Sequence, residues 1–173
     1  LDGYEFYSGL IDAFSGHLKS DRNERSILYR NEGGNKFSDV SEEVGLLESS
    51  WSGDASPIDV NEDGWPDLYV LNMQGDDEYY ENVEGKQFVK KSREVFPATS
   101  WGSMGIKVFD FNNDGCLDLF TFIENPSDPD ILYRNNCDGT FTDVAKQATV
   151  ENFRYTKGVV WGDYNGDRWP DLF

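Results

Sequence analysis

Short runs in which apolar and polar residues alternate recur along the chain, separated by turn-forming residues. The clearest set occupies residues 106–109, 117–123, 131–134 and 140–144. Alternation with a period of two is typical of half-buried β-strands. Helical periodicity over about 11 residues is not convincing anywhere, and only residues 41–47 and 144–149 would suit a single helical turn. The pattern therefore predicts an all-β protein.

Two landmarks recur three times along the chain. The first is an acidic stretch of nine residues, which begins at Asp59, Asp110 and Asp163. The second is an asparagine followed six residues later by a phenylalanine, with the asparagine at positions 31, 82 and 135. The distance from each asparagine to the next acidic stretch is 28 residues in all three copies. Such a fixed spacing indicates a structural repeat, here of 51 and then 53 residues. The two extra residues are assigned to the turn at 125–130.

Each repeat is read as four short strands, which is the composition of one β-propeller blade. The fold class predicted is all-β, a β-propeller segment of four-stranded antiparallel blades with two complete blades and two partial ones. The expected divisions are a partial blade at 1–49 with an insertion at about 9–25, blades at 50–99 and 100–151, and the start of a blade at 152–173. Because a closed propeller takes about 4–8 blades, we expect the sequence to be a fragment whose first partners are the remaining blades of the same propeller.

The net charge narrows the possible partners. Acidic residues number 33 against 15 basic ones, which gives a formal charge of −18. Such a charge repels phosphate backbones, so nucleic acid is not an expected partner. No run approaches the about 18–20 apolar residues of a membrane span. An aromatic content of 15% argues against disorder and for a packed core.

The acidic nonapeptide has the composition of a calcium loop. Side chains at positions 1, 3, 5 and 9 and the carbonyl of position 7 would form a cage of oxygens, which suits Ca²⁺ better than Mg²⁺ or zinc. The candidate ligands are Asp59, Asn61, Asp63, Trp65 and Asp67 in the first loop, Asp110, Asn112, Asp114, Cys116 and Asp118 in the second, and Asp163, Asn165, Asp167, Trp169 and Asp171 in the third. One Ca²⁺ is expected in each loop, and three ions would reduce the net charge from −18 to −12.

Two other interpretations of these loops were weighed. An EF-hand loop opens with the same spacing, but it needs a glutamate at position 12, where Val70 and Thr121 stand, and helical flanks. The second interpretation is that these residues only form a turn, since Asp, Asn and Gly are common turn formers. A turn alone does not explain acids at positions 1, 5 and 9 in every copy.

The third loop departs from the pattern, because Arg168 replaces the glycine of position 6, where a positive φ is expected. Gly166 at position 4 offers another place for the turn, so calcium is less certain there.

The segments 162–173 and 132–144 closely resemble the calcium-binding FG-GAP/VCBS β-propeller family. The segment 101–115 is most similar to the secreted cartilage-acidic-protein type, which often carries an ASPIC/UnbV domain after the propeller. The resemblance covers about residues 26–173 and implies an extracellular or periplasmic setting. Propellers of this family serve as adhesion heads, lectin-like modules and enzyme scaffolds, so the family does not fix an activity.

The two cysteines allow a geometric prediction. If strands 117–123 and 131–135 pair so that opposed residue numbers sum to 253, Cys116 faces Cys137 within reach of a disulfide. Two free thiols in a reducing compartment are the alternative. The extracellular setting that the resemblance implies favours the disulfide.

The remaining aromatic and basic residues have structural interpretations. Trp65 and Trp169 are expected to cover their loops against a neighbouring blade, and Trp51, Trp101 and Trp161 to lie between blades. For Lys90 and Lys91, local salt bridges are favoured over a binding patch.

The function predicted is a calcium-stabilised propeller of a secreted or cell-surface protein, with Ca²⁺ as a structural component and loops that contact proteins or glycans, as in cell adhesion. The alternative is the scaffold of a polysaccharide-degrading, lyase-like enzyme. The sequence identifies no catalytic residue, and an assay on acidic polysaccharides with and without calcium separates the two hypotheses.

Overall fold

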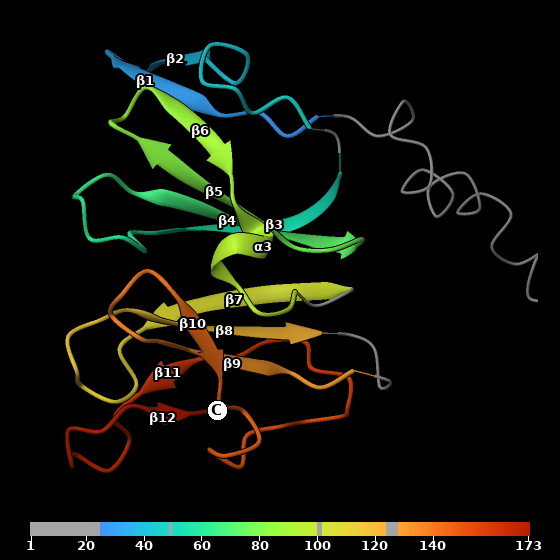
Figure 1. Ribbon diagram of the computed structural model, residues 1–173, viewed down its shortest axis with the longest axis vertical. Coiled ribbons are helices and arrows are strands. Elements are labelled where there is room, and N and C mark those ends of the chain that lie inside the picture. Colours follow the sequence, from blue (N-terminus) through green and yellow to red (C-terminus); the bar gives the residue numbers. More distant parts are fainter. Residues whose placement is uncertain (1–24, 49, 100–101, 124–127) are drawn as a thin grey trace, which may run out of the picture. The chain divides into compact units, whose positions relative to one another are not determined.

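Every sheet in the described residues is antiparallel and follows the order of the chain (Figure 1). The computed structural model describes residues 25–48, 50–99, 102–123 and 128–173. The chain divides between residues 51 and 52 into two units, each of which is described by itself. The insertion expected at about 9–25 and the position of Trp101 lie outside the described residues, apart from Arg25.

The first unit contains one hairpin, in which β1 (Tyr29–Gly33) pairs with β2 (Lys36–Asp39). The second unit contains two four-stranded sheets. One comprises β3 (Trp51–Ile58), β4 (Asp67–Gln74), β5 (Glu78–Val83) and β6 (Gln87–Lys90). The other comprises β7 (Ser103–Phe109), β8 (Asp118–Ile123), β9 (Ile131–Asn135) and β10 (Phe141–Asp143). A final pair is formed by β11 (Trp161–Gly162) and β12 (Asp171–Leu172). The all-β, four-stranded organisation is as predicted.

The spacing of six residues between asparagine and phenylalanine reflects strand pairing. The two residues face each other across a hairpin in all three copies: Asn31 with Phe37, Asn82 with Phe88, and Asn135 with Phe141. A change in this spacing would alter the register of the hairpin, and a shift of one residue moves every side chain to the other face of the sheet.

The register predicted for β8 and β9 was wrong by one residue. Opposed residues sum to 252 rather than 253, with Leu119 facing Tyr133 and Phe120 facing Leu132. The reason is burial, because opposed residues point to the same face of an antiparallel pair. The observed register places buried Leu119 against buried Tyr133. The predicted register would have placed Leu119 opposite Arg134.

One short helix was not predicted. The helix α3 (Ser92–Val95) is a single turn directly after the fourth strand of its sheet. It corresponds in position to the turns at 41–45 and 145–149, where a helical turn was expected. The neighbouring salt bridges were predicted correctly, since Lys90 pairs with Glu78 and Lys91 with Glu81, each at 2.7 Å.

Successive residues of β8 point into two different hydrophobic cores, and all six are buried. Leu119 joins a core with side chains of both four-stranded sheets, including Tyr69 of β4 and Tyr133 of β9, and with Phe96. Phe120 joins a second core that includes Trp161, whose ring stacks on Phe109 at 3.4 Å between centroids. Trp161 therefore lies between successive sheets, as predicted. Burial on both faces also explains why β8 reads as a continuous apolar run.

A buried carboxylate links each complete sheet to the segment that follows it. Asp77 Oδ1 accepts a hydrogen bond from the N–H of Asn72 at 3.1 Å, and its Oδ2 accepts one from the hydroxyl of Ser103 at 2.7 Å. Asp130 repeats this arrangement with the N–H of Ile123 at 3.0 Å and the hydroxyl of Thr156 at 2.7 Å. Carboxylate and hydroxyl are 26 residues apart in both copies. These bonds fix the start of one repeat to the connection between the second and third strands of the repeat before it.

We expect Asp77→Asn to change the pH dependence of stability. Burial raises the pKa of Asp77 from 3.8 to about 7, against the hydrogen bonds from Ser103, Asn72 and Tyr69. A raised folded-state pKa gives stability that is present below pH 4 and is lost as the pH rises through about 7. Asparagine does not ionise, so from about pH 5 to about pH 8 the variant should gain about 2–3 kcal/mol relative to the natural chain. Urea unfolding in saturating calcium at about pH 5 and about pH 8 measures the stability of both chains. If the variant and the natural chain differ in stability by the same amount at both pH values, the prediction is wrong.

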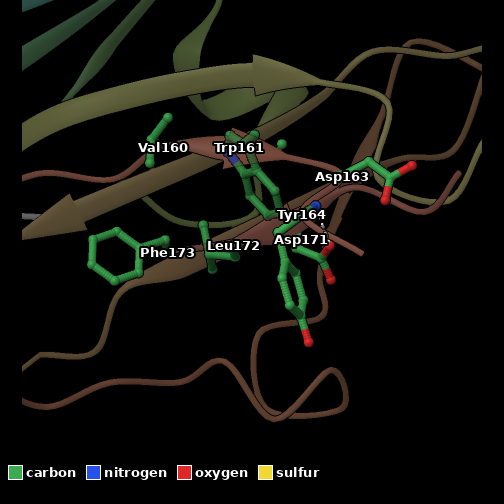
Figure 2. A pocket seen from close by; sticks show the side chains of 8 residues that line it. Val160, Trp161, Asp163, Tyr164, Asp171, Leu172 and Phe173 are labelled. Atoms are coloured by element: carbon green, nitrogen blue, oxygen red, sulfur yellow. Dashed lines mark hydrogen bonds between the residues drawn. The ribbon is translucent and has the colours of Figure 1, made fainter. Parts of the chain in front are cut away.

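The sheet of β11 and β12 borders an apolar hollow (Figure 2). Its volume is about 660 Å³, and Val160, Trp161, Leu172 and Phe173 supply its apolar wall. Phe173 is 94% exposed. Within the described residues, β11 and β12 form a sheet of two strands. The hollow lies beside the third acidic loop, because Asp163 and Asp171 also line it.

Candidate metal centre

The three acidic loops connect paired strands. They lie between β3 and β4, between β7 and β8, and between β11 and β12. No helix flanks any of them in the described residues. Because an EF-hand loop connects two helices, the EF-hand interpretation is excluded.

The carboxylate at position 1 is held inside each loop by backbone N–H groups. Asp59 accepts hydrogen bonds from the N–H of Asp63 at 3.2 Å and of Gly64 at 2.9 Å. The corresponding distances are 3.1 and 2.9 Å at Asp110, and 3.1 and 2.8 Å at Asp163. The first carboxylate therefore points into the loop in all three copies.

The side chains at positions 3 and 5 are hydrogen-bonded to each other and to the loop backbone. In the first loop Asn61 Oδ1 accepts the N–H of Asp63 at 3.2 Å, and Asp63 Oδ1 accepts the N–H of Trp65 at 2.8 Å. The amide of Asn61 also donates to Asp63 Oδ2 at 3.0 Å. The second and third loops repeat all three bonds. The sequence motif thus produces one conformation three times, with its polar side chains gathered together.

The carboxylate at position 9 joins the loop to two strands. Asp67 accepts the N–H of Val60 at 3.0 Å and the N–H of Asn82 at 2.8 Å, and the hydroxyl of Tyr79 donates to it at 2.6 Å. Asp118 accepts the N–H of Phe111 at 2.9 Å and of Asn135 at 2.8 Å. Both carboxylates are buried, with 1% and 0% exposure.

Burial also governs the titration of these two acids. It raises the pKa of Asp118 to about 6, and the charges of Asp114 and Asp110 raise it further against the backbone hydrogen bonds. Burial likewise raises the pKa of Asp67, although Tyr79 and two backbone N–H groups lower it. A cation close to these groups would favour their charged forms.

The expectation that Gly166 would relocate the turn of the third loop was wrong. Positions 4 and 6 have positive φ in every loop: 56° at Glu62 and 86° at Gly64, 56° at Asn113 and 95° at Gly115, 79° at Gly166 and 74° at Arg168. Each loop has one glycine and one residue with a side chain at these positions. The third loop only exchanges their order, so the conformation is preserved with Arg168 in the left-handed region.

Arg168→Gly should therefore stabilise the chain by about 0.5–1 kcal/mol, because a side chain in the left-handed region costs about 1–2 kcal/mol and glycine loses part of this gain through backbone entropy. The matched opposite change is Gly115→Arg. A Cβ at Gly115 would meet no atom within 4 Å, so its cost is only conformational. Urea unfolding in calcium measures both, and the prediction is wrong if the two variants shift stability in the same direction.

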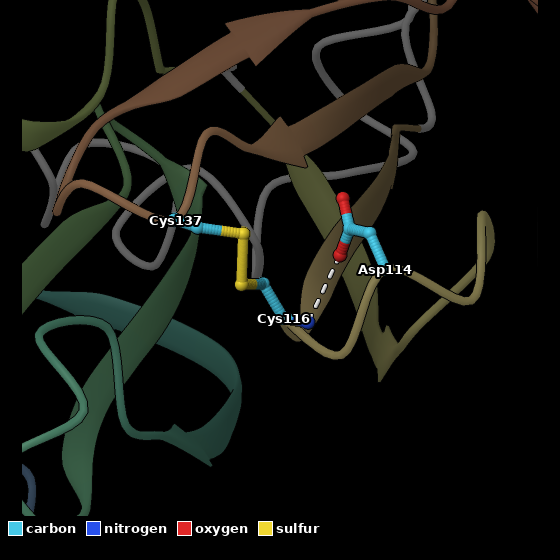
Figure 3. A group of neighbouring side chains, drawn as sticks. All are labelled: Asp114, Cys116 and Cys137. Carbon is cyan, nitrogen blue, oxygen red and sulfur yellow. Dashed lines mark hydrogen bonds between the residues drawn. A yellow bond between two sulfur atoms is a disulfide. The ribbon is translucent and has the colours of Figure 1, made fainter.

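The residue at position 7 binds its loop to the second hairpin of the same sheet. Cys116 forms a disulfide with Cys137, with 5.9 Å between the Cα atoms, as predicted (Figure 3). In the preceding sheet the ring of Trp65 lies against Gly85, where an added Cβ would stand 2.5 Å from the ring. This contact lies within its own sheet, and the cover of the loop against a neighbouring blade stays a prediction. Trp65 and Trp169 are 45% and 56% exposed.

Neighbouring loops touch through their fourth residues. Glu62 Oε1 of the first loop lies 3.3 Å from Cys116 Sγ of the second. The amide of Asn113 donates to the carbonyl of Arg168 in the third loop at 3.3 Å. The acidic loops consequently lie side by side along one edge of the successive sheets.

The donor set fits a hard cation. Each loop gathers two carboxylates and an asparagine oxygen, and each carboxylate oxygen that accepts one N–H keeps a second lone pair. Among the described residues, one group of three His, Cys, Asp or Glu has ligand atoms mutually within 4.8 Å, namely Asp114, Cys116 and Cys137. The three carboxylates of positions 1, 5 and 9 lie farther apart than this in every loop. The two sulfur atoms are joined in the disulfide and offer no thiolate. The available ligands are therefore oxygens, which suits Ca²⁺.

The acidic motif did not predict the asparagines that are hydrogen-bonded to its last carboxylate. Asn82 and Asn135 donate their backbone N–H to the position 9 carboxylate, and their side chains donate to the carbonyls of Pro66 at 2.9 Å and Leu117 at 3.2 Å. A signal was available, because these asparagines are one of the two landmarks of the repeat.

Comparison with known proteins agrees with this geometry. A family model described as FG-GAP-like repeat matches residues 8–70, 59–121 and 122–173. Over 72 residues the chain is 33% identical to a protein of Xenopus tropicalis named Cartilage acidic protein 1. That match covers 41% of this chain and 11% of the relative. In the part of the chain that the structure describes, no helix has the length and apolar character needed to cross a membrane.

Proposed function

The chain belongs to the FG-GAP-like repeat family, and from this we propose that it is a calcium-binding β-propeller segment in which Ca²⁺ is a structural component. The observation that carries the proposal is the acidic loop, whose hydrogen bonds recur in three copies with the same donor atoms. Bound Ca²⁺ would supply positive charge among the carboxylates of positions 1, 5 and 9. The residues of the chain would hold the two strands of each loop together through the position 9 carboxylate.

We further propose that the protein is secreted or exposed at the cell surface, where its loops contact proteins or glycans in a role such as adhesion. The disulfide between Cys116 and Cys137 supports this setting, since disulfides persist in oxidising compartments. The similarity to a protein named Cartilage acidic protein 1 also supports it. Millimolar calcium sites are typical of extracellular modules.

The proposal is tested by calorimetric titration of the decalcified chain with Ca²⁺. We expect three sites, and we expect Asp63→Asn, Asp114→Asn and Asp167→Asn each to remove or greatly weaken one of them. Asp54→Asn is the matched control, because Asp54 is exposed and lies outside the loops. Absence of binding, or an unchanged number of sites in all three loop variants, would refute calcium binding by these loops.

A further inference from the structure

Arg134 lacks the countercharge that the equivalent residue has in the two other repeats. It immediately precedes the landmark Asn135, as Arg30 precedes Asn31 and Glu81 precedes Asn82. Arg30 forms ion pairs with Glu32 at 2.8 Å and Glu43 at 3.1 Å. Glu81 forms one with Lys91 at 2.7 Å. Among the described residues, Arg134 is hydrogen-bonded to Asn136 Oδ1 at 3.2 Å and to no carboxylate.

The missing acids can be identified by position. The two partners of Arg30 lie one and 12 residues after Asn31. The corresponding residues after Asn135 are Asn136 and Gln147. Both carboxylates are therefore replaced by neutral amides, while the arginine is kept. A half-buried guanidinium without a carboxylate retains donors for an external anion.

The guanidinium also borders a cavity. Its volume is about 300 Å³, and it is lined by Phe111, Asn112, Arg134, Val144, Gln147 and Ala148. Phe111, Val144 and Ala148 supply an apolar wall, whereas Arg134 and Gln147 supply polar groups. Asn112, which is position 3 of the second acidic loop, also lines the cavity. The site thus combines a cation with room for a short aliphatic chain, which matches the side chain of a glutamate.

We infer that the Arg134 cavity binds the carboxylate of a glutamate side chain from an acidic peptide segment of a partner protein. The first repeat shows the same chemistry within the chain, where the carboxylate of Glu43 reaches Arg30. The planar guanidinium can hold both carboxylate oxygens, and the apolar wall contacts the methylene stem. Charges farther than about 8 Å from the cavity are screened at physiological salt, and the test is made in calcium, which would offset the charge of the neighbouring second acidic loop.

The test uses the full chain in calcium and two capped tripeptides, Ala-Glu-Ala and its neutral counterpart Ala-Gln-Ala. NMR titration should show saturable shifts of the Arg134 side-chain Nε–Hε signal with the glutamate peptide. The chain should bind the glutamate peptide at least about tenfold more tightly than the glutamine peptide, as expected for hydrogen bonds to a charged group. Equal affinities for the two peptides, or no saturable shift with either, would overturn the inference.

Variants give a second and independent arm. Arg134→Gln removes the cation, and Gln147→Glu supplies the carboxylate that the first repeat has, so each should weaken binding at least about tenfold. Lys146→Gln is the control, because it removes a neighbouring exposed charge outside the cavity, and it should change affinity less than about twofold. If the Gln147→Glu variant binds the glutamate peptide as tightly as the natural chain, the peptide does not bind in the Arg134 cavity. Binding of free glutarate without binding of the glutamate peptide contradicts a protein partner. None of these results depends on the number of calcium sites.

Discussion

Chelation of calcium is expected to lower the melting temperature of the chain by more than about 15 °C. With calcium at about 100 times the dissociation constant, each site adds about 2.7 kcal/mol to the free energy of unfolding. Three independent sites add about 8 kcal/mol, and in a domain of this size each kcal/mol shifts the melting temperature by about 2–4 °C. Differential scanning calorimetry with and without EGTA measures the shift.

The structural reason for this large effect lies in the loop carboxylates. Without a cation, Asp118 stays buried close to the charges of Asp110 and Asp114. Its raised pKa of about 6 means that the calcium-free fold is stabilised by protonation and loses that stability as the pH rises through about 6. A chain freed of calcium beforehand should therefore be destabilised relative to the calcium-bound chain more at pH 8 than at pH 5. Identical melting curves with calcium and with EGTA at pH 8 would count against a structural role for the ion.

The sequence predicted the repeat because the structure reuses one set of contacts at fixed spacing. The asparagine and phenylalanine of each repeat are cross-strand partners, and the acids of each loop bind the same backbone N–H groups. Such contacts depend on distance along the chain, which is visible in the sequence. The strand pattern and the loop positions could therefore be predicted without coordinates. The disulfide pairing was also predicted correctly, although the register used for it was wrong by one residue.

The errors concern contacts that depend on packing. The register of β8 and β9 is fixed by the burial of Leu119 against Tyr133, and the sequence between these strands does not reveal it. The conformation of Arg168 is imposed by the hydrogen bonds around it and not by its own preference, because its N–H donates to Asp163 at 2.8 Å. The contact of Trp65 with Gly85 was not predicted, because the lack of a side chain at Gly85 gives no signal in the pattern.

The linking carboxylates were also missed, although they repeat. Asp77 and Asp130 each stand five residues before a landmark asparagine, a spacing that is regular in the sequence. Their partners, Ser103 and Thr156, also stand at a fixed spacing of 26 residues but differ in type. The regular spacing was therefore visible in the sequence, but only the structure shows that the acid of one repeat is bonded to the hydroxyl of the next.

Phe96→Ala is expected to destabilise the chain by about 3–5 kcal/mol, which is typical of a phenylalanine removed from a packed core. Phe96 is 1% exposed and follows the short helix α3. Its ring lies 4.9 Å from that of Tyr69 in one sheet and 5.2 Å from Tyr133 and 4.6 Å from Phe141 in the next. The loss should therefore weaken the contact between successive sheets, and not only one of them. Urea unfolding in saturating calcium measures it, with Phe153→Ala as control, since Phe153 is 51% exposed and should cost less than about 1 kcal/mol. A loss at Phe96 no larger than at Phe153 would mean that the two sheets hold together without this ring.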